Sequence, residues 1–183
     1  FDPDKALRMG EDPTAAGSAA PAEVYMETLL VEEQNAYSAQ VPPGGDPWYD
    51  TELFARTVPL TWNYELLVDN YVPGTAPVLL TVGAWGRGEW PGLTDNHHMQ
   101  FAFNGQPVNE ISFGGTKDVS FAKELPNGVL QEGSNTLSIT LPGDTGALWE
   151  FDYLDSYGVI YPRAFVARDG ALTFTAKGDV FKV

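Results

Sequence analysis

The only two histidines of the chain, His97 and His98, are adjacent and lie just after Asp95 in the stretch TDNHHMQFAFNGQPV, residues 94–108. Imidazole titrates near neutral pH and is a common metal ligand, so the stretch is a candidate acid–base or metal site. Adjacent residues of a β-strand point to opposite faces, however, so two histidines of one regular strand cannot bind the same ion. No HxH or HExxH pattern completes a ligand set. We therefore expect polar residues at the start of a strand here.

Three carboxylates lie close together in WEFDYLDSY, namely Glu150, Asp152 and Asp155. Paired carboxylates are the chemistry of glycoside hydrolysis, and Glu150 and Asp152 would lie on one strand face, about 7 Å apart. Alternating acids on a strand usually form its solvent face, and we expect that arrangement. A free-standing glycoside hydrolase or lyase that uses these acids and a histidine is the least favoured function.

Calcium is a second candidate chemistry, because hard oxygen ligands are plentiful and a sandwich often ties its ends together with an ion. Acids near the first expected strand could meet acids near a late strand. The candidate calcium ligands are Glu27, Glu32 or Glu33 on one side and Asp152 and Asp155 on the other. No contiguous loop of the DxDxDG type is present, and acids that contribute only to solubility are the alternative interpretation.

Aromatic residues stand in or beside the loops DPWYD and GAWGRGEWPG. An indole ring can stack on the C–H face of a sugar while neighbouring polar groups bind its hydroxyls, so these loops are candidates for glycan binding. The alternative is that the rings cover the open end of a sandwich. The candidate ligand-binding residues are Trp48, Tyr49, Trp85, Arg87, Trp90, Asp95, His97 and His98.

The composition excludes several classes of protein. The formal net charge of −15 repels the phosphates of nucleic acids and anionic lipid surfaces. The absence of cysteine excludes a disulfide, a thiolate nucleophile and a zinc–thiolate site. No apolar run approaches the roughly 20 residues that cross a bilayer, and no Gly-x-Ser-x-Gly motif is present. We expect neither a nucleic-acid partner nor membrane insertion, and no enzymatic activity.

The chain is rich in aromatic residues, glycine and proline, which is typical of short strands joined by turns. Alternate apolar residues from 58 to 68 predict one long strand, and Asn104-Gly105 predicts a type I′ hairpin turn. Residues 24–37 fit a helix or a strand, and the context favours a strand. Further strands are expected at 77–85, 98–103, 107–113, 117–122, 135–141, 147–154, 157–167, 171–176 and 179–183, with a loop at 41–50.

Strands at intervals of roughly 8–12 residues are typical of sandwiches and barrels. The predicted fold is therefore all-β: an antiparallel, jelly-roll-like β-sandwich formed by residues 23–183 as a single domain. Residues 1–22 are rich in alanine, glycine, proline and acid, and they predict an irregular leader or linker.

The order of several segments resembles a known family. The segments are YMETLLVEEQNAY, PWY, FARTVPLTWNYEL, DNHHMQFAFNGQPV, LQEGSNTLSITL, LDSYGVIYPR and ALTFTA. Together they resemble, over roughly residues 24–183, the β-sandwich domain that precedes the catalytic domain of gingipain-like cysteine peptidases and related secreted bacterial proteins. The resemblance implies an architecture similar to carbohydrate-binding modules, a caspase-like peptidase domain as the downstream partner in the same polypeptide, and secretion or a cell-surface location. Since the chain has no cysteine, no catalytic residue carries over.

Two functions of different classes follow. The first is a non-catalytic accessory domain of a larger secreted bacterial protein, associated with a peptidase, that acts in interdomain packing or in ligand or substrate interaction. The alternative is a carbohydrate-binding module that recognises a glycan through its loop aromatics.

Overall fold

The computed structural model describes residues 22–41 and 45–175, and these residues form strands joined by turns. This part of the chain contains no helix that is long and apolar enough to cross a membrane. The strands are β1 (Val24–Val31), β2 (Ala36–Tyr37), β3 (Trp48–Tyr49), β4 (Thr51–Ala55), β5 (Leu60–Val68), β6 (Leu79–Gly86), β7 (His97–Phe103), β8 (Gln106–Phe113), β9 (Lys117–Glu124), β10 (Gly133–Leu141) and β11 (Glu150–Ala164).

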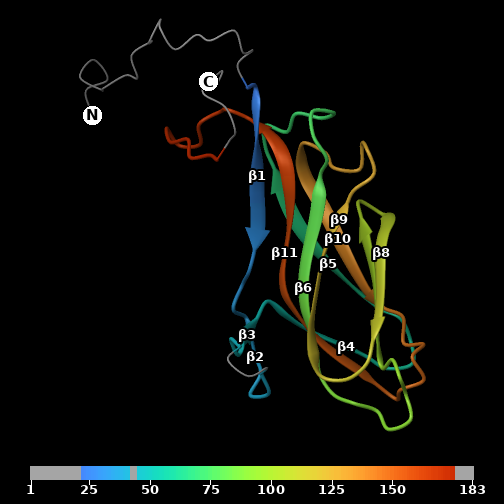
Figure 1. Ribbon diagram of the computed structural model, residues 1–183. Helices are drawn as coiled ribbons and strands as arrows, with labels where there is room; N and C mark the ends of the chain where they lie inside the picture. Colours follow the sequence, from blue (N-terminus) through green and yellow to red (C-terminus); the bar gives the residue numbers. More distant parts are fainter. Residues whose placement is uncertain (1–21, 42–44, 176–183) are drawn as a thin grey trace, which may run out of the picture.

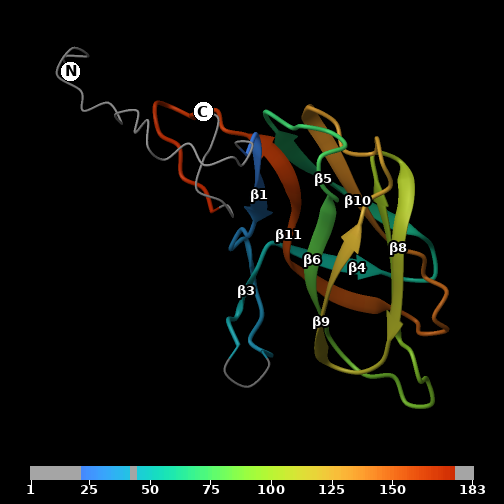
Figure 2. The same ribbon diagram turned by 45° about the horizontal axis from the view of Figure 1, so that its top comes forward.

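The strands form two antiparallel sheets and a small hairpin. The first sheet has the order β1-β11-β6-β9, with β4 also paired to β11; the second has the order β5-β10-β7-β8; β2 pairs with β3. From β4 onward the chain passes repeatedly between the two sheets, and Figures 1 and 2 show the long β11 beside β1 and β6. The predicted all-β antiparallel sandwich is confirmed.

The core lies between the two sheets, because each strand directs alternate side chains inward. On β7, Met99, Phe101 and Phe103 are buried, and Leu137 and Ile139 of the neighbouring β10 are buried beside them. The same buried cluster includes side chains of β4, β6 and β11 from the first sheet. Apolar burial between the sheets is therefore what holds the elements of the site in place.

The turn between β7 and β8 has the predicted geometry. Asn104 and Gly105 both have positive φ angles, 49° and 78°. The Asn104 amide also donates to the Val129 carbonyl oxygen (2.7 Å) and to Asn135 Oδ1 (2.8 Å), while its Oδ1 accepts from the Thr136 backbone N–H (2.8 Å). This side chain therefore ties the hairpin to the start of β10.

Replacement of Asn104 by alanine should lower the free energy of unfolding by about 2–4 kcal/mol, because three hydrogen bonds are lost and the left-handed backbone becomes strained. Urea unfolding of the purified chain measures this change. Gly105→Ala is the matched control, since it introduces only the backbone strain and should cost about 1–2 kcal/mol. Equal losses in the two variants would contradict the role given to the Asn104 side chain.

Some predicted strand boundaries need correction. The strands expected at 147–154 and 157–167 are one continuous strand, β11, with a bulge between Leu154 and Ser156 that keeps its pairing to β6. The loop expected at 41–50 contains β3, which pairs with β2. β4 was not predicted as a strand of its own, because five residues with two buried side chains give little periodicity.

The C-terminal strand predictions have a different outcome. Within the described part of 171–176, Ala171 forms only an isolated bridge with Arg168, so the strand expected there is wrong. The strand expected at 179–183 lies outside the described residues, as does the expected leader except for its last residue.

Candidate binding cleft and buried histidine–carboxylate cluster

The first residues of β11 carry different chemistry on their two faces. Glu150 and Asp152 point between the sheets and are only 2% and 0% exposed, whereas Phe151 and Tyr153 point to the outer face. The expectation that these two acids form a solvent face is therefore wrong. β11 pairs with β4 on one side and with β6 on the other, and the register of this pairing places the two acids on the inner face of the sheet.

The buried acids meet His97, which points inward from the first residue of β7. One ligand-type atom from each of His97, Glu150 and Asp152 lies within 4.8 Å of the other two. His97 Nδ1 is 2.8 Å from Asp152 Oδ1, but the geometry falls outside that of a hydrogen bond. The backbone N–H of His98 donates to Glu150 Oε1 at 2.5 Å. The two sheets thus bring His97 together with two acids that lie more than 50 residues later in the sequence.

Burial governs the electrostatics of this cluster. Burial, and then the charge of Asp152, raise the pKa of Glu150 above its usual range. Burial also raises the pKa of Asp152, although the contact with His97 acts in the opposite direction. Two carboxylates that share a dry site cannot both remain ionised without a compensating positive charge.

The other side of the His97 ring is closely packed. Its ring stacks on Phe113 with 4.7 Å between centroids. Its Nε2 lies 3.3 Å from the Gly88 carbonyl oxygen and 2.9 Å from the amide nitrogen of Asn96. A side chain at Gly86 would overlap the Phe113 ring and approach Nε2 to 3.1 Å, so a glycine here leaves room for the imidazole.

The second histidine is separated from the cluster, as strand alternation predicts. His98 is partly exposed on the opposite face of β7, where Nδ1 lies 2.6 Å from Asp144 Oδ1 and Nε2 lies 2.6 Å from Glu110 Oε1. Burial acts to lower the pKa of His98, but these two carboxylates outweigh it and the net shift is upward. His97 and His98 therefore belong to different environments.

On the outer face of the first sheet, three aromatic rings form a stack. Trp85 of β6 lies against Tyr49 of β3, with 5.6 Å between ring centroids and 5° between planes, and Tyr153 of β11 packs on both. All three are buried, because the β2–β3 hairpin covers this part of the sheet. This corrects the expectation that Trp85 and Tyr49 present their rings at the surface. Trp85 is the penultimate residue of β6 rather than a loop residue.

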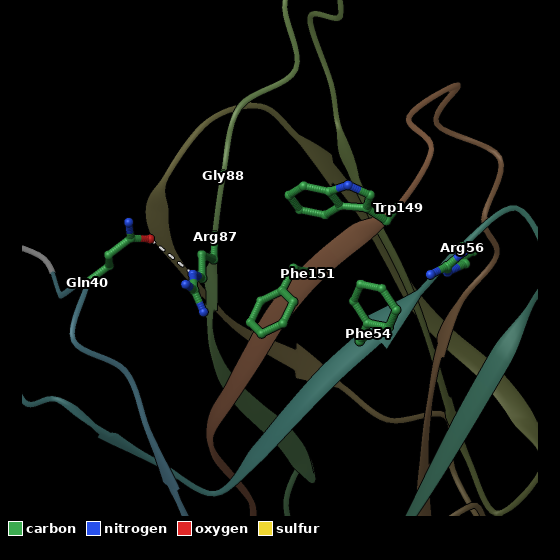
Figure 3. A pocket seen from close by; sticks show the side chains of 7 residues that line it. All are labelled: Gln40, Phe54, Arg56, Arg87, Gly88, Trp149 and Phe151. Carbon is green, nitrogen blue, oxygen red and sulfur yellow. Dashed lines mark hydrogen bonds between the residues drawn. The ribbon is translucent and has the colours of Figure 1, made fainter.

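Beside this stack lies an open cleft of about 530 Å³ (Figure 3). Its walls come from β4 and β11, the residues next to these two strands, the segment after β6, and Gln40. Figure 3 shows the rings of Phe151 and Phe54 side by side between the two arginines, with the ring of Trp149 above them. Trp149 is 40% exposed and Phe54 is also exposed. The lining residues are Gln40, Phe54, Arg56, Arg87, Gly88, Trp149 and Phe151.

Arg87 is held at one end of the cleft by several contacts. Its Nε donates to Gln40 Oε1 (3.0 Å) and a terminal nitrogen donates to the Tyr153 hydroxyl (3.1 Å), while the guanidinium carbon lies 4.8 Å from the centre of the Phe151 ring. A guanidinium over a ring face is attracted by the quadrupole of the ring. The cleft therefore combines apolar surface with a fixed cationic group, within a chain of net charge −15.

The remaining predicted ligand residues lie at different distances from this cleft. Trp90 stands against Trp149, with ring centroids 5.3 Å apart, and its indole N–H donates to the Trp149 carbonyl oxygen at 3.1 Å. Trp48 is exposed on the hairpin against Tyr37, and Asp95 is exposed before β7. Only Arg87 of the predicted residues lines the cleft itself.

The predicted calcium ligands are not brought together as one set. Glu27 accepts a hydrogen bond from Tyr25 and lies opposite Tyr161 in the sheet, nine positions along β11 from Asp152, or roughly 30 Å at the usual strand rise. Asp155 has a raised pKa, through burial and through the charge of nearby acids of which Glu32 is the first. Glu33 is exposed. Asp152 instead belongs to the cluster with His97.

Sequence reasoning missed Phe54, Arg56, Trp149 and Phe151 as cleft residues, and it missed the convergence of His97 with the acids. The sequence did contain a signal for the inward position of His97, because this residue continues the alternation by which Met99 and Phe101 face the core. The cleft gave no such signal, since its walls come from segments nearly 100 residues apart.

Comparisons with known proteins support the fold. No protein-family model matches the chain, and no curated protein matches it. Among solved structures, the chain is similar to dimeric latent PorU from Porphyromonas gingivalis, at 16% identity and a TM-score of 0.55 over 85% of this chain. The chain spans only 14% of that structure. The sandwich fold implied by the sequence resemblance is thereby confirmed.

Carbohydrate-binding modules are also among the similar solved structures. A CBM36 module in complex with calcium and xylotriose shows 15% identity, a TM-score of 0.38 and coverage of 73% of this chain and 92% of that chain. A family 35 module from Clostridium thermocellum shows 16% identity, a TM-score of 0.38 and coverage of 77% and 98%.

Proposed function

We propose that this chain is a non-catalytic accessory domain of a larger, secreted or surface-located bacterial protein associated with a gingipain-like peptidase. In this proposal the aromatic cleft of Figure 3 is the surface that contacts a neighbouring domain of the same polypeptide. The observation that carries the proposal is the group of three aromatic rings, two of them exposed, between two arginines on the outer face of the first sheet.

The chemistry of the cleft supports a protein partner that is apolar with acidic groups. Interfaces are enriched in aromatic residues and arginine, and these residues supply most of the binding energy where they have been measured. Arg87 is already held in place by Gln40 and Tyr153, so it loses little conformational freedom when a carboxylate binds. The fold likeness to a small part of the much larger PorU structure is a further support.

A glycan is the second candidate occupant, because the same arrangement of rings, guanidinium groups and amide suits a sugar. The ring of Trp149 offers a flat apolar face, and Arg56, Arg87 and Gln40 offer hydrogen-bond donors around it. The volume of about 530 Å³ lies within the range of small-molecule sites. A sugar that carries a carboxylate would fit the two arginines best.

The test compares variants in the natural full-length polypeptide that contains these residues. Trp149→Ala combined with Phe54→Ala should weaken the contact with the neighbouring domain, because these are the two exposed rings of the cleft. We expect the neighbouring domain to unfold at a lower temperature, or to lose activity, while the sandwich itself keeps its circular dichroism. Leu67→Ala, an exposed apolar residue of β5 on the other sheet, is the matched control.

Affinity electrophoresis of the isolated chain on acidic and neutral polysaccharides separates the two occupants. Retardation that disappears in the double variant identifies a glycan as the occupant and contradicts a protein neighbour. A neighbouring domain that behaves identically with wild-type and double-variant chains, without any retardation, would contradict the function of the cleft altogether.

A further inference from the structure

We propose that His97, Glu150 and Asp152 form a site for one transition-metal dication, with Zn²⁺ as the expected ion, between the two sheets. The site would join β7 of the second sheet to β11 of the first. It lies on the inner face of β11, whereas the cleft lies on the outer face, so this proposal does not depend on the proposed function.

The spacing of the three side chains suits a single small ion. Their ligand atoms lie within 4.8 Å of one another, and His97 Nδ1 is 2.8 Å from Asp152 Oδ1. Around a tetrahedral ion with bonds of about 2.0–2.2 Å, ligand atoms lie about 3.3–3.6 Å apart. The observed separations lie on both sides of this range, so side-chain shifts of about 1 Å would complete the coordination.

A second observation points to a missing partner. His97 Nδ1, Glu150 Oε2 and both carboxylate oxygens of Asp152 are buried and form no hydrogen bond within the described residues. Buried polar atoms without partners are rare in folded proteins and destabilise them. All four atoms belong to the three residues of the cluster, so one bound cation would give each of these side chains a partner.

The ligand types select the class of ion. One imidazole nitrogen with two carboxylate oxygens is a mixed set that suits Zn²⁺ and its neighbours, whereas Ca²⁺ and Mg²⁺ prefer oxygen ligands alone. Two carboxylates and a dication also balance in charge, which matters in an interior from which water is excluded. The chain has no cysteine, so no thiolate competes for the ion.

The far side of the imidazole is arranged as in other metal-bound histidines. When a histidine binds metal through one nitrogen, the other usually donates its proton to a carbonyl or carboxylate. The Gly88 carbonyl oxygen lies 3.3 Å from Nε2 and can accept this proton, which frees the Nδ1 lone pair for the ion. The Asn96 amide nitrogen, 2.9 Å from Nε2, favours the opposite tautomer, so metal binding would switch the ring from one tautomer to the other.

The experiment refolds the chain with excess Zn²⁺, removes free metal by gel filtration and counts the bound metal by mass spectrometry. We expect one Zn²⁺ per wild-type chain and a higher melting temperature than after chelation. Glu150→Gln and Asp152→Asn preserve the side-chain shapes and should each weaken Zn²⁺ binding by at least about tenfold to a hundredfold. A wild-type chain that retains no zinc overturns the proposal, whether or not the variants fold.

Glu110→Gln is the matched control, because Glu110 lies beside the exposed His98 and could hold zinc at the surface. This variant should retain zinc like the wild type. If Glu110→Gln loses the ion while Glu150→Gln keeps it, the metal binds at His98 and the buried site is refuted. Co²⁺ provides a second readout on the wild-type chain: an imidazole and two carboxylates should give visible absorption bands that disappear on chelation, and an unchanged spectrum would count against the site.

Discussion

Replacement of Asp69 by alanine should lower the free energy of unfolding by about 2–4 kcal/mol, because it leaves a buried guanidinium without its counter-charge. Arg163 of β11 is only 1% exposed, and its nitrogens donate to Asp69 at 3.0 and 3.3 Å and to the Tyr25 hydroxyl at 2.5 Å. Removal of one partner of a buried ion pair costs about 3–5 kcal/mol. Asp69 is itself 36% exposed, so solvent screening places the expected loss somewhat lower.

The exposed partner of the same carboxylate supplies the control. Arg168 also donates to Asp69, at 2.9 Å through Nε, but its side chain is 45% exposed, against 1% for Arg163. Arg168→Ala should therefore cost less than about 1 kcal/mol. Thermal and urea unfolding measure both variants. If Arg168→Ala proved as damaging as Asp69→Ala, the burial of Arg163 would not be the reason for the effect.

The pH dependence of the free energy of unfolding tests the ion pairs of Asp69 in a second way. Hydrogen bonds from Arg168, and then from Arg163, hold the pKa of Asp69 well below its usual range, although burial acts in the opposite direction. A carboxyl whose pKa is lowered by folding stabilises the protein above its unfolded-state pKa, about 4, and this stability is lost as the pH falls through the folded-state value. The stability difference between wild type and Asp69→Asn should therefore shrink below about pH 4 and stay constant above about pH 5.

Trp85→Ala should lower the free energy of unfolding by about 3–5 kcal/mol, because its ring is fully buried in the outer stack. The β2–β3 hairpin packs on the sheet through Tyr49, which stacks directly on Trp85. Loss of the ring should also release this hairpin, and limited proteolysis should then cut the chain between residues 36 and 49.

Trp90→Ala is the comparison for this prediction, since Trp90 is partly exposed and, among the aromatic rings of residues 22–41 and 45–175, contacts only Trp149. This variant should lower the free energy of unfolding by less than about 1 kcal/mol and leave the β2–β3 hairpin protected from proteolysis. A loss below 1 kcal/mol for Trp85→Ala, or unchanged proteolysis, would show that the hairpin is held by other contacts.

The sandwich fold could be predicted because short patterns in the sequence indicate its strands and turns. Alternation on β5 and β7 fixed which side chains face the core, and Asn104-Gly105 fixed the hairpin between β7 and β8. The same alternation correctly separated His97 from His98. These features depend on residues that are near one another in the sequence.

The site could not be predicted in the same way, because it depends on how the two sheets pack. The pairing of β11 with β4 and β6 sets which of its side chains face inward, and Glu150 is one of them. Its polarity alone suggested the solvent face. Trp85 looked like a loop residue because glycines surround it, yet the β2–β3 hairpin covers it. The cleft depends on β4 and β11 being adjacent, which no local pattern encodes.

Hydrogen exchange of the full-length polypeptide, compared with the isolated chain, tests the central claim most directly. If the cleft contacts a neighbouring domain, the backbone amides of 54–56, 87–88 and 149–151 should exchange more slowly in the full-length polypeptide, and Trp149→Ala should abolish the difference. Amides of β5 on the other sheet should exchange alike in both. Equal exchange at the cleft in the two proteins would contradict the proposal that it is a surface for interdomain contact.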